Sequence, residues 1–384
     1  MTKHNATVIL LVFATLLMCQ GARAAESTVP ELFVGFDDSS QLAINYDDLT
    51  SLLRAVVVDV GRSSRTVTEV PPDITGTRMK AKVKRFTANE GNRFYYETFT
   101  DNDAAQQYVL NIRKSLEQLP SETPLASFSR DEQLAYWLNL YNVTVLNEVI
   151  AVYPRRTLRK LFRGRSSIFS KKLLNVAGIP LSLDDIQYTI LSRNYDNDPL
   201  IIYGLYQGIV GAPNIRTSAY TGDDVYRALE ENADVFINSN RGTLGREEEF
   251  FQVSSFYDRN RQYFPDFDAD LTEHLLTFLD GKERERLEAV GKLKPDIDDW
   301  TVTDMGGTVP VVGRSLAHNN AALLDSYKGN RRNIDGSVRL ATLKIEREKK
   351  DPREDEVELE DLERFPVEGA NVEEVSAEDP GTTD

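Results

Sequence analysis

The sequence predicts one α+β domain over about residues 30–305, with a helix-rich body around a small, mainly antiparallel sheet. Long segments with apolar residues at helical spacing alternate with short runs that are typical of strands. The predicted strands centre on Arg93, Val176, Ile202 and Phe251. Helices and short strands interleaved in this way are typical of the α+β class.

The central element is a predicted helix from Ser129 to Tyr153, and it is apolar on nearly all sides, which predicts burial. Ser129 and Glu132 have the spacing of a capping box at its start. Asn139 and Asn142 are three residues apart and therefore share one face. A buried amide without a hydrogen bond costs about 1–3 kcal/mol. These two side chains therefore either tie neighbouring backbone to the core or line a cleft.

A second helix is predicted to begin after Ser182, with Asp184 and Asp185 in its first turn. Carboxylates are favoured there by the helix dipole, so capping is the simpler interpretation and acid–base chemistry is the alternative. Asp185 is kept as a cleft candidate together with Asn139 and Asn142.

An ordered set of motifs resembles the bacterial family called domain of unknown function 547 (DUF547). The set spans roughly residues 32–306, and its members are Trp137-Leu-Asn-Leu-Tyr-Asn142, Leu173 to Ile186, Asp198-Pro199, Ala219 to Gly222 and Asp298 to Trp300. The resemblance implies an enzyme-like α+β fold with a papain- or transglutaminase-like outline. It implies no particular activity.

Sequences of this family commonly carry one His and two Cys in the stretch that ends at Pro213. Here the corresponding residues are Ile202, Gln207 and Ala212. None of the three supplies a nucleophile or a base to activate one. The comparison therefore predicts no thiol chemistry and no catalytic residue, and it leaves Gln207 as a fourth cleft candidate. It also makes the chain a pseudoenzyme candidate.

The first 24 residues have the features of a secretory signal peptide, with an apolar run from Ala6 to Met18 and small residues around Arg23. Cleavage is expected after Ala24. It would remove Cys19, the sole cysteine, so the exported chain would have no disulfide and no thiolate. We therefore expect a soluble periplasmic or secreted protein without a transmembrane segment.

Acidic and basic residues are distributed unevenly along the rest of the chain. We predict a globular region over residues 25–306, an extension over 307–350 and an acidic, disordered tail over 351–384. A cationic segment follows the central helix, and its anion-binding candidates are Arg155, Arg156, Arg159, Lys160, Arg163 and Arg165. The sequence leaves three interpretations of this segment open: a solvated charged surface, an anion-binding site or a binding site for the acidic tail. Nucleic acid is a poor partner for an exported chain with a formal net charge of −16.

No motif indicates a metal or another cofactor. His274 and His318, the histidines that remain after export, are far apart in sequence and lack a short ligand spacing. The glycines carry no phosphate-binding or dinucleotide-binding pattern.

Three functions follow from these observations. The first is a non-catalytic envelope protein that binds an anionic ligand or another envelope protein. The second is an assembly component that acts through the acidic tail. The alternative is a periplasmic hydrolase that uses carboxylates, such as Asp184, Asp185 or Asp198, with Asn142 in place of a thiol.

Overall fold

The computed structural model describes residues 29–63, 65, 90–155, 157–164, 167–246 and 249–305. The predicted signal peptide with Cys19, the predicted strand at 79–87, Arg156, Arg165, His318, the extension and the acidic tail lie outside the described residues.

The predicted central helix is confirmed as α4 (Arg130–Ile150), and most of its side chains are buried. The side chain of Ser129 accepts a hydrogen bond from the Glu132 N–H at 3.2 Å, as expected for a cap. The Glu132 carboxylate differs from the expected capping box, because it accepts the N–H groups of Ile44 (3.0 Å) and Gly222 (2.9 Å) instead. Glu132 therefore joins two distant segments to the start of α4.

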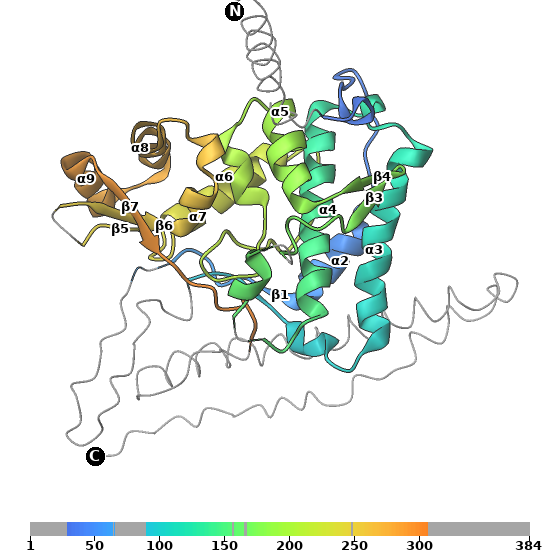
Figure 1. Cartoon of the computed structure of the whole chain (residues 1–384), viewed down its shortest axis with the longest axis horizontal. Helices are drawn as coiled ribbons and strands as arrows, with labels where there is room; N and C mark the ends of the chain where they lie inside the picture. Colours follow the sequence, from blue (N-terminus) through green and yellow to red (C-terminus); the bar gives the residue numbers. More distant parts are fainter. Residues whose placement is uncertain are drawn as a thin grey trace, which may run out of the picture. The chain divides into compact units, whose positions relative to one another are not determined.

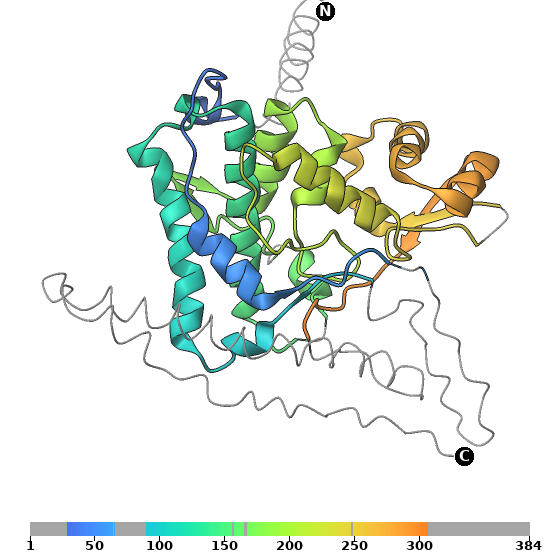
Figure 2. The same ribbon diagram turned by 180° about the vertical axis from the view of Figure 1, so that it is seen from behind.

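Two further helices pack beside the central one. α3 (Asp103–Glu122) lies along α4, and α2 (Asp47–Val56) lies nearby, on the side that Figure 2 shows. The side chain of Asn102 caps α3 by accepting the Ala105 N–H at 3.0 Å. Both helices bury an apolar stripe of side chains.

Within the described residues the strands form three small sheets, which confirms the α+β class. β1 (Val57–Val58) pairs with β2 (Arg93–Phe94), and β3 (Leu174–Val176) forms a hairpin with β4 (Ile179–Leu181), both antiparallel. In the third sheet β6 (Phe251–Ser254) lies between β5 (Thr243–Leu244), which is antiparallel to it, and β7 (Leu293–Ile297), which is parallel. Figure 1 shows this third sheet on the opposite side of α6 from the α3–α4 pair.

The strand predicted around Ile202 is wrong. Residues Pro199–Gly204 form a 3-10 helix, η6, in which Asp198 accepts the Leu200 N–H at 2.8 Å and Pro199 occupies the first turn. A short apolar run indicates burial but does not distinguish a strand from a buried helical turn. The backbone at Gly204 lies so close to Leu138 and Leu229 that a Cβ there would be under 3 Å from their side chains.

The remaining helical segments complete the described part of the chain. They are the 3-10 segments Glu31–Phe33, Tyr96–Phe99, Leu125–Ser127, η4 (Arg159–Phe162) and Arg261–Tyr263, the π-helix η5 (Asp185–Leu191), and α5 (Ser192–Asn194), α6 (Val225–Ile237), α7 (Ser255–Arg259), α8 (Phe267–Phe278) and α9 (Gly281–Val290). None of the helices described is both long enough and apolar enough to cross a membrane.

Candidate functional site

A half-open cavity of about 120 Å³ lies where η4, η5, α7 and the loop after η6 meet. It is lined by aromatic and polar side chains, namely Phe162, Ser167, Phe169, Asp184, Gln187, Tyr188, Gln207 and Arg259. It contains one residue of the predicted cleft set, Gln207, and one carboxylate discussed with that set, Asp184.

The unusual winding of η5 supplies three of these side chains. Asp184 precedes the π-helical turns, and Gln187 and Tyr188 follow at positions i+3 and i+4. π-Helical segments are rare and are found frequently at functional sites. The sequence predicted a helix here but gave no indication of this winding.

Asp185 caps the helix. Its carboxylate accepts the Ser182 N–H at 2.6 Å and forms an ion pair with Lys172, while its own N–H donates to Ser182 Oγ at 3.1 Å. Burial alone would raise the pKa of Asp185, but the hydrogen bonds from Lys172 and Ser182 outweigh it and lower the pKa. The capping interpretation therefore describes this residue, which does not line the cavity.

Asp184 has the opposite environment. Its pKa is raised, first by burial and then by the charge of Asp185, with Lys172 opposing. Lys172 is bound to Asp185 rather than to Asp184. Within the described part of the chain no cation forms an ion pair with Asp184, so its carboxyl group remains available to the cavity.

Arg259 supplies the positive charge. Its Nη2 donates to Gln207 Oε1 at 3.1 Å and its Nη1 to Ser255 Oγ at 2.9 Å, and its guanidinium stacks on the Trp300 ring, 4.8 Å from the centroid. Ser255 in turn donates to Asp298 Oδ1 at 3.1 Å. Burial lowers the pKa of Arg259, with Asp298 opposing. Arg259 forms no ion pair with any described residue.

A second layer of hydrogen bonds fixes the cavity wall. Tyr188 Oη donates to the Arg259 carbonyl at 3.0 Å, and Gln187 Nε2 donates to Asn260 Oδ1 at 2.5 Å. Burial, followed by the charge of Asp184, raises the pKa of Tyr188 to about 12. These contacts join η5 to α7, so Asp184 and Arg259 are held on one connected framework.

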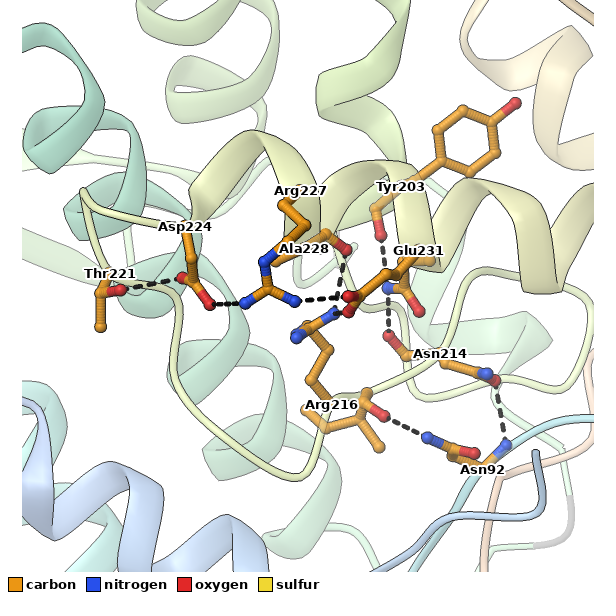
Figure 3. Close-up of polar contacts among 11 residues, drawn as sticks. Asn92, Tyr203, Asn214, Arg216, Thr221, Asp224, Arg227, Ala228 and Glu231 are labelled. Carbon is orange, nitrogen blue, oxygen red and sulfur yellow. Dashed lines mark hydrogen bonds and ion pairs between the residues drawn. The ribbon is translucent and has the colours of Figure 1, made fainter. Parts of the chain in front are cut away.

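Gln207 lies near the start of the long loop between η6 and α6, and asparagines hold this loop. Asn142 Nδ2 donates to the Gly204 carbonyl and its Oδ1 accepts the Tyr206 N–H, both at 2.9 Å. Farther along, Asn232 Nδ2 donates to the carbonyls of Tyr203 (2.8 Å) and Asn214 (2.9 Å), as Figure 3 shows. The loop is thereby positioned by amide–backbone contacts.

The end of the same loop is held by charges along α6. Arg227 bridges Asp224 and Glu231, and Glu231 also pairs with Arg216 at 3.1 Å (Figure 3). Thr221 Oγ1 donates to Asp224 Oδ1 at 2.8 Å just before the helix begins, although the side chain of Asp224, the N-cap residue, accepts no capping hydrogen bond from the helix. None of these side chains lines the cavity, so the pairs serve to position the loop.

The four cleft candidates do not line one common cavity. Asn139 pairs with the backbone of Tyr220 in both directions, at 2.8 and 3.0 Å, as Asn142 does with Gly204 and Tyr206. Both asparagines border a separate, very small cavity of about 10 Å³. Among the described residues they therefore have the structural role of tying backbone to the core.

The comparison with protein families concerns this same region. Residues 125–237 match the family described as "Protein of unknown function, DUF547". The resemblance predicted from the sequence is thus confirmed for this segment. No curated protein and no solved structure matched the chain.

The DUF547 segment contains α4, η5 and Gln207, whereas Arg259 and Trp300 lie beyond it. The cavity therefore combines residues of the matched segment with residues from outside it. Ile202 is fully buried in η6 and does not line this cavity.

The cationic segment, called the rim below, reaches the cavity through Phe162. Arg155, Arg159, Lys160 and Arg163 are exposed, while Phe162 lines the cavity and packs against Trp300 at 4.9 Å between ring centroids. The Leu158 N–H donates to the Trp300 carbonyl at 3.0 Å. The rim is therefore attached to the residue on which Arg259 stacks.

Sequence reasoning missed Arg259, Gln187, Tyr188 and Ser167. The polar positions 184, 187 and 188 at helical spacing were a usable signal for a polar helix face. Nothing in the local sequence of Arg259 distinguished it from other surface arginines, since its environment arises from Trp300 and Gln207. No group of three or more His, Cys, Asp or Glu side chains that could hold a metal lies among the described residues.

Proposed function

We propose that this chain is a non-catalytic binding protein of the cell envelope that holds a small carboxylate ligand in the cavity around Arg259. One observation carries the proposal. The guanidinium lines a cavity and has no carboxylate partner among the described residues.

Arginine has five N–H donors in a planar fork, which matches a carboxylate. Two hydrogen bonds of Arg259 to described residues leave the other donors unused. Asp298 only partly offsets the burial of the Arg259 charge, and a bound anion would pair with this charge directly. The stacking on Trp300 and the bond to Gln207 hold the fork in place before a ligand arrives, which reduces the entropy lost on binding.

The carboxylate-hydrolase alternative has less support. Asp185 caps η5, Asp198 caps η6, and Asn142 holds backbone at another place, so only Asp184 of that set faces the cavity. Ser167, the cavity hydroxyl, accepts the Phe169 N–H at 3.2 Å. His274 lies in an aromatic cluster, bound to Tyr203 Oη at 2.9 Å. The arrangement of these groups favours binding over catalysis.

The envelope location rests on the sequence of residues 1–24 and is part of the proposal. Mass spectrometry of the mature protein tests it, with an N-terminus at Ala25 expected. A retained Cys19, with or without lipid, would contradict it.

Isothermal titration with propionate tests the binding proposal. We expect Arg259→Gln to weaken binding by about ten-fold or more, because a hydrogen-bonded charge pair contributes about 1.5–3 kcal/mol. The matched control is Arg163→Gln, which removes an exposed cation of the rim and should leave the affinity nearly unchanged. Equal losses in both variants would assign the anion site to the cationic segment, and no binding to the wild-type protein would refute the proposal.

A further inference from the structure

The cavity has two poles of opposite charge that do not pair with each other. Asp184 and Arg259 both line it, yet no ion pair joins them within the 4.0 Å range that defines one among the described residues. Two flexible side chains of opposite charge that line the same cavity ordinarily form an ion pair. Here Arg259 is held by Gln207, Ser255 and Trp300, and Asp184 occupies the N-cap position just before η5.

Tyr188 lies within the influence of both poles. Its pKa responds to Asp184 in one direction and to Arg259 in the other, after the larger contribution of burial. Its hydroxyl is already used by the Arg259 carbonyl at 3.0 Å. The phenol therefore contributes to the cavity wall that these two residues also line.

The charge of Lys172 only partly offsets the burial of Asp184 and the like charge of Asp185. On its own element it faces Asp185, a like charge, and the nearest cation, Lys172, is bound to that neighbour. From the packed elements the titratable groups nearby are Tyr188, Tyr141 and Arg259, of which only Arg259 is cationic. A simple anion bound to Arg259 would satisfy one pole and leave the other unpaired.

We propose that the ligand is a small zwitterion, an amino acid whose carboxylate binds Arg259 and whose ammonium group binds Asp184. This inference rests on the proposed function and names its ligand class. A zwitterion neutralises both poles without adding net charge to a partly buried site, which the desolvation cost of unpaired ions favours.

The size of the cavity limits the ligand. Its volume of about 120 Å³ is comparable to the roughly 150 Å³ cavity that holds one benzene molecule, so about six non-hydrogen atoms fit. Alanine has this size. The amide groups of Gln187 and Gln207 line the same wall and offer neutral hydrogen-bond partners for the remaining polar atoms.

Three ligands of similar shape distinguish the contribution of Asp184 to binding from that of Arg259. Alanine carries both charges, propionate lacks the ammonium group, and alaninamide lacks the carboxylate. We expect the wild-type protein to bind alanine at least about ten-fold more tightly than either of the others, measured by titration calorimetry at neutral pH.

Substitutions at Asp184 and Arg259 test which charged group of the ligand each residue binds. Asp184→Asn should reduce alanine binding to the level of propionate, and Arg259→Gln should weaken both ligands. Asp184→Ala is the second neutral variant, and thermal unfolding shows that each variant is folded. If propionate binds as tightly as alanine, or if both Asp184 variants keep the preference for alanine, the zwitterion inference is wrong while the carboxylate site stands. If neither alanine nor propionate binds, both proposals fail.

Discussion

The guanidinium of Arg259 lies 4.8 Å from the centre of the Trp300 ring. Trp300 itself is fixed from the other side, because its carbonyl accepts the Leu158 N–H and Phe162 packs edge-on against its ring. The stacking therefore connects the cationic rim, the cavity and α7 in one contact, and it orients the only cation among the described residues that lines the cavity.

Replacing Trp300 tests the role of this stacking. A cation–π contact contributes about 0.5–2 kcal/mol, so Trp300→Leu should weaken propionate binding by roughly 2–30-fold. Trp300→Phe keeps an aromatic face and should lose less. Titration calorimetry of both variants measures the difference, and equal affinities for the Leu variant and the wild type would show that Arg259 is positioned without the indole.

Asp184 and Asp185 should respond oppositely to neutralisation. The pKa of Asp184 is raised by burial, so its ionised form lowers the stability of the folded protein at neutral pH. Asp184→Asn should therefore stabilise the protein at pH 7. That advantage should shrink as the pH falls through the raised pKa and vanish below the unfolded value of 3.8.

The neighbouring substitution is the internal control. The pKa of Asp185 is lowered by the bonds from Lys172 and Ser182, which outweigh its burial, so its ionised form stabilises the folded state above the unfolded pKa. Asp185→Asn should destabilise at pH 7, and the loss should diminish as the pH falls through the folded pKa. Chemical denaturation at several pH values measures both; shifts of the same sign in the two variants would contradict the assignment.

His274 should make the protein acid-sensitive. It is partly buried among aromatic rings, it is hydrogen-bonded to Tyr203, and burial lowers its pKa from 6.5 to about 4. The stabilisation from keeping it neutral is fully present above pH 6.5 and is lost as the pH falls toward 4, by up to about 3 kcal/mol.

A substitution isolates this contribution. His274→Phe should flatten the dependence of unfolding free energy on pH between 6.5 and 4, whereas His318→Gln should leave the curve as it is. An unchanged slope in the His274 variant would place the acid sensitivity in another group.

Asn139 should be more important to stability than its small size suggests. It satisfies both the N–H and the carbonyl of Tyr220, and its removal leaves these buried groups unpaired at about 1–3 kcal/mol each. Asn139→Ala should lower the unfolding free energy accordingly. Asn175→Ala, on an exposed strand position, should stay within about 0.5 kcal/mol of the wild type; a similarly small effect at Asn139 would refute its role as a tie.

The elements predicted best from the sequence were those fixed by local rules. The apolar periodicity of α4 and the cap at Ser129 depend on neighbouring residues and were correctly located. The hairpin of β3 and β4 also follows from a short local pattern. Ile202 was misassigned because its burial in η6 comes from tertiary packing, which a short apolar run does not specify.

The site was harder to predict for the same physical reason. Asp184 and Gln207 were noticed, but their common cavity requires the π-helical winding of η5 and the distant residue Arg259. The asparagines attracted attention as buried amides, and their partners proved to be backbone groups. Which buried polar group faces a cavity is set by contacts between segments far apart in sequence.

A crystal structure of the full chain with bound propionate tests the central claim most directly. The account predicts that the carboxylate lies against the guanidinium of Arg259 and within the cavity that Asp184 and Gln207 line. A carboxylate bound instead to the exposed cations Arg159, Lys160 or Arg163, with the cavity empty, would contradict it.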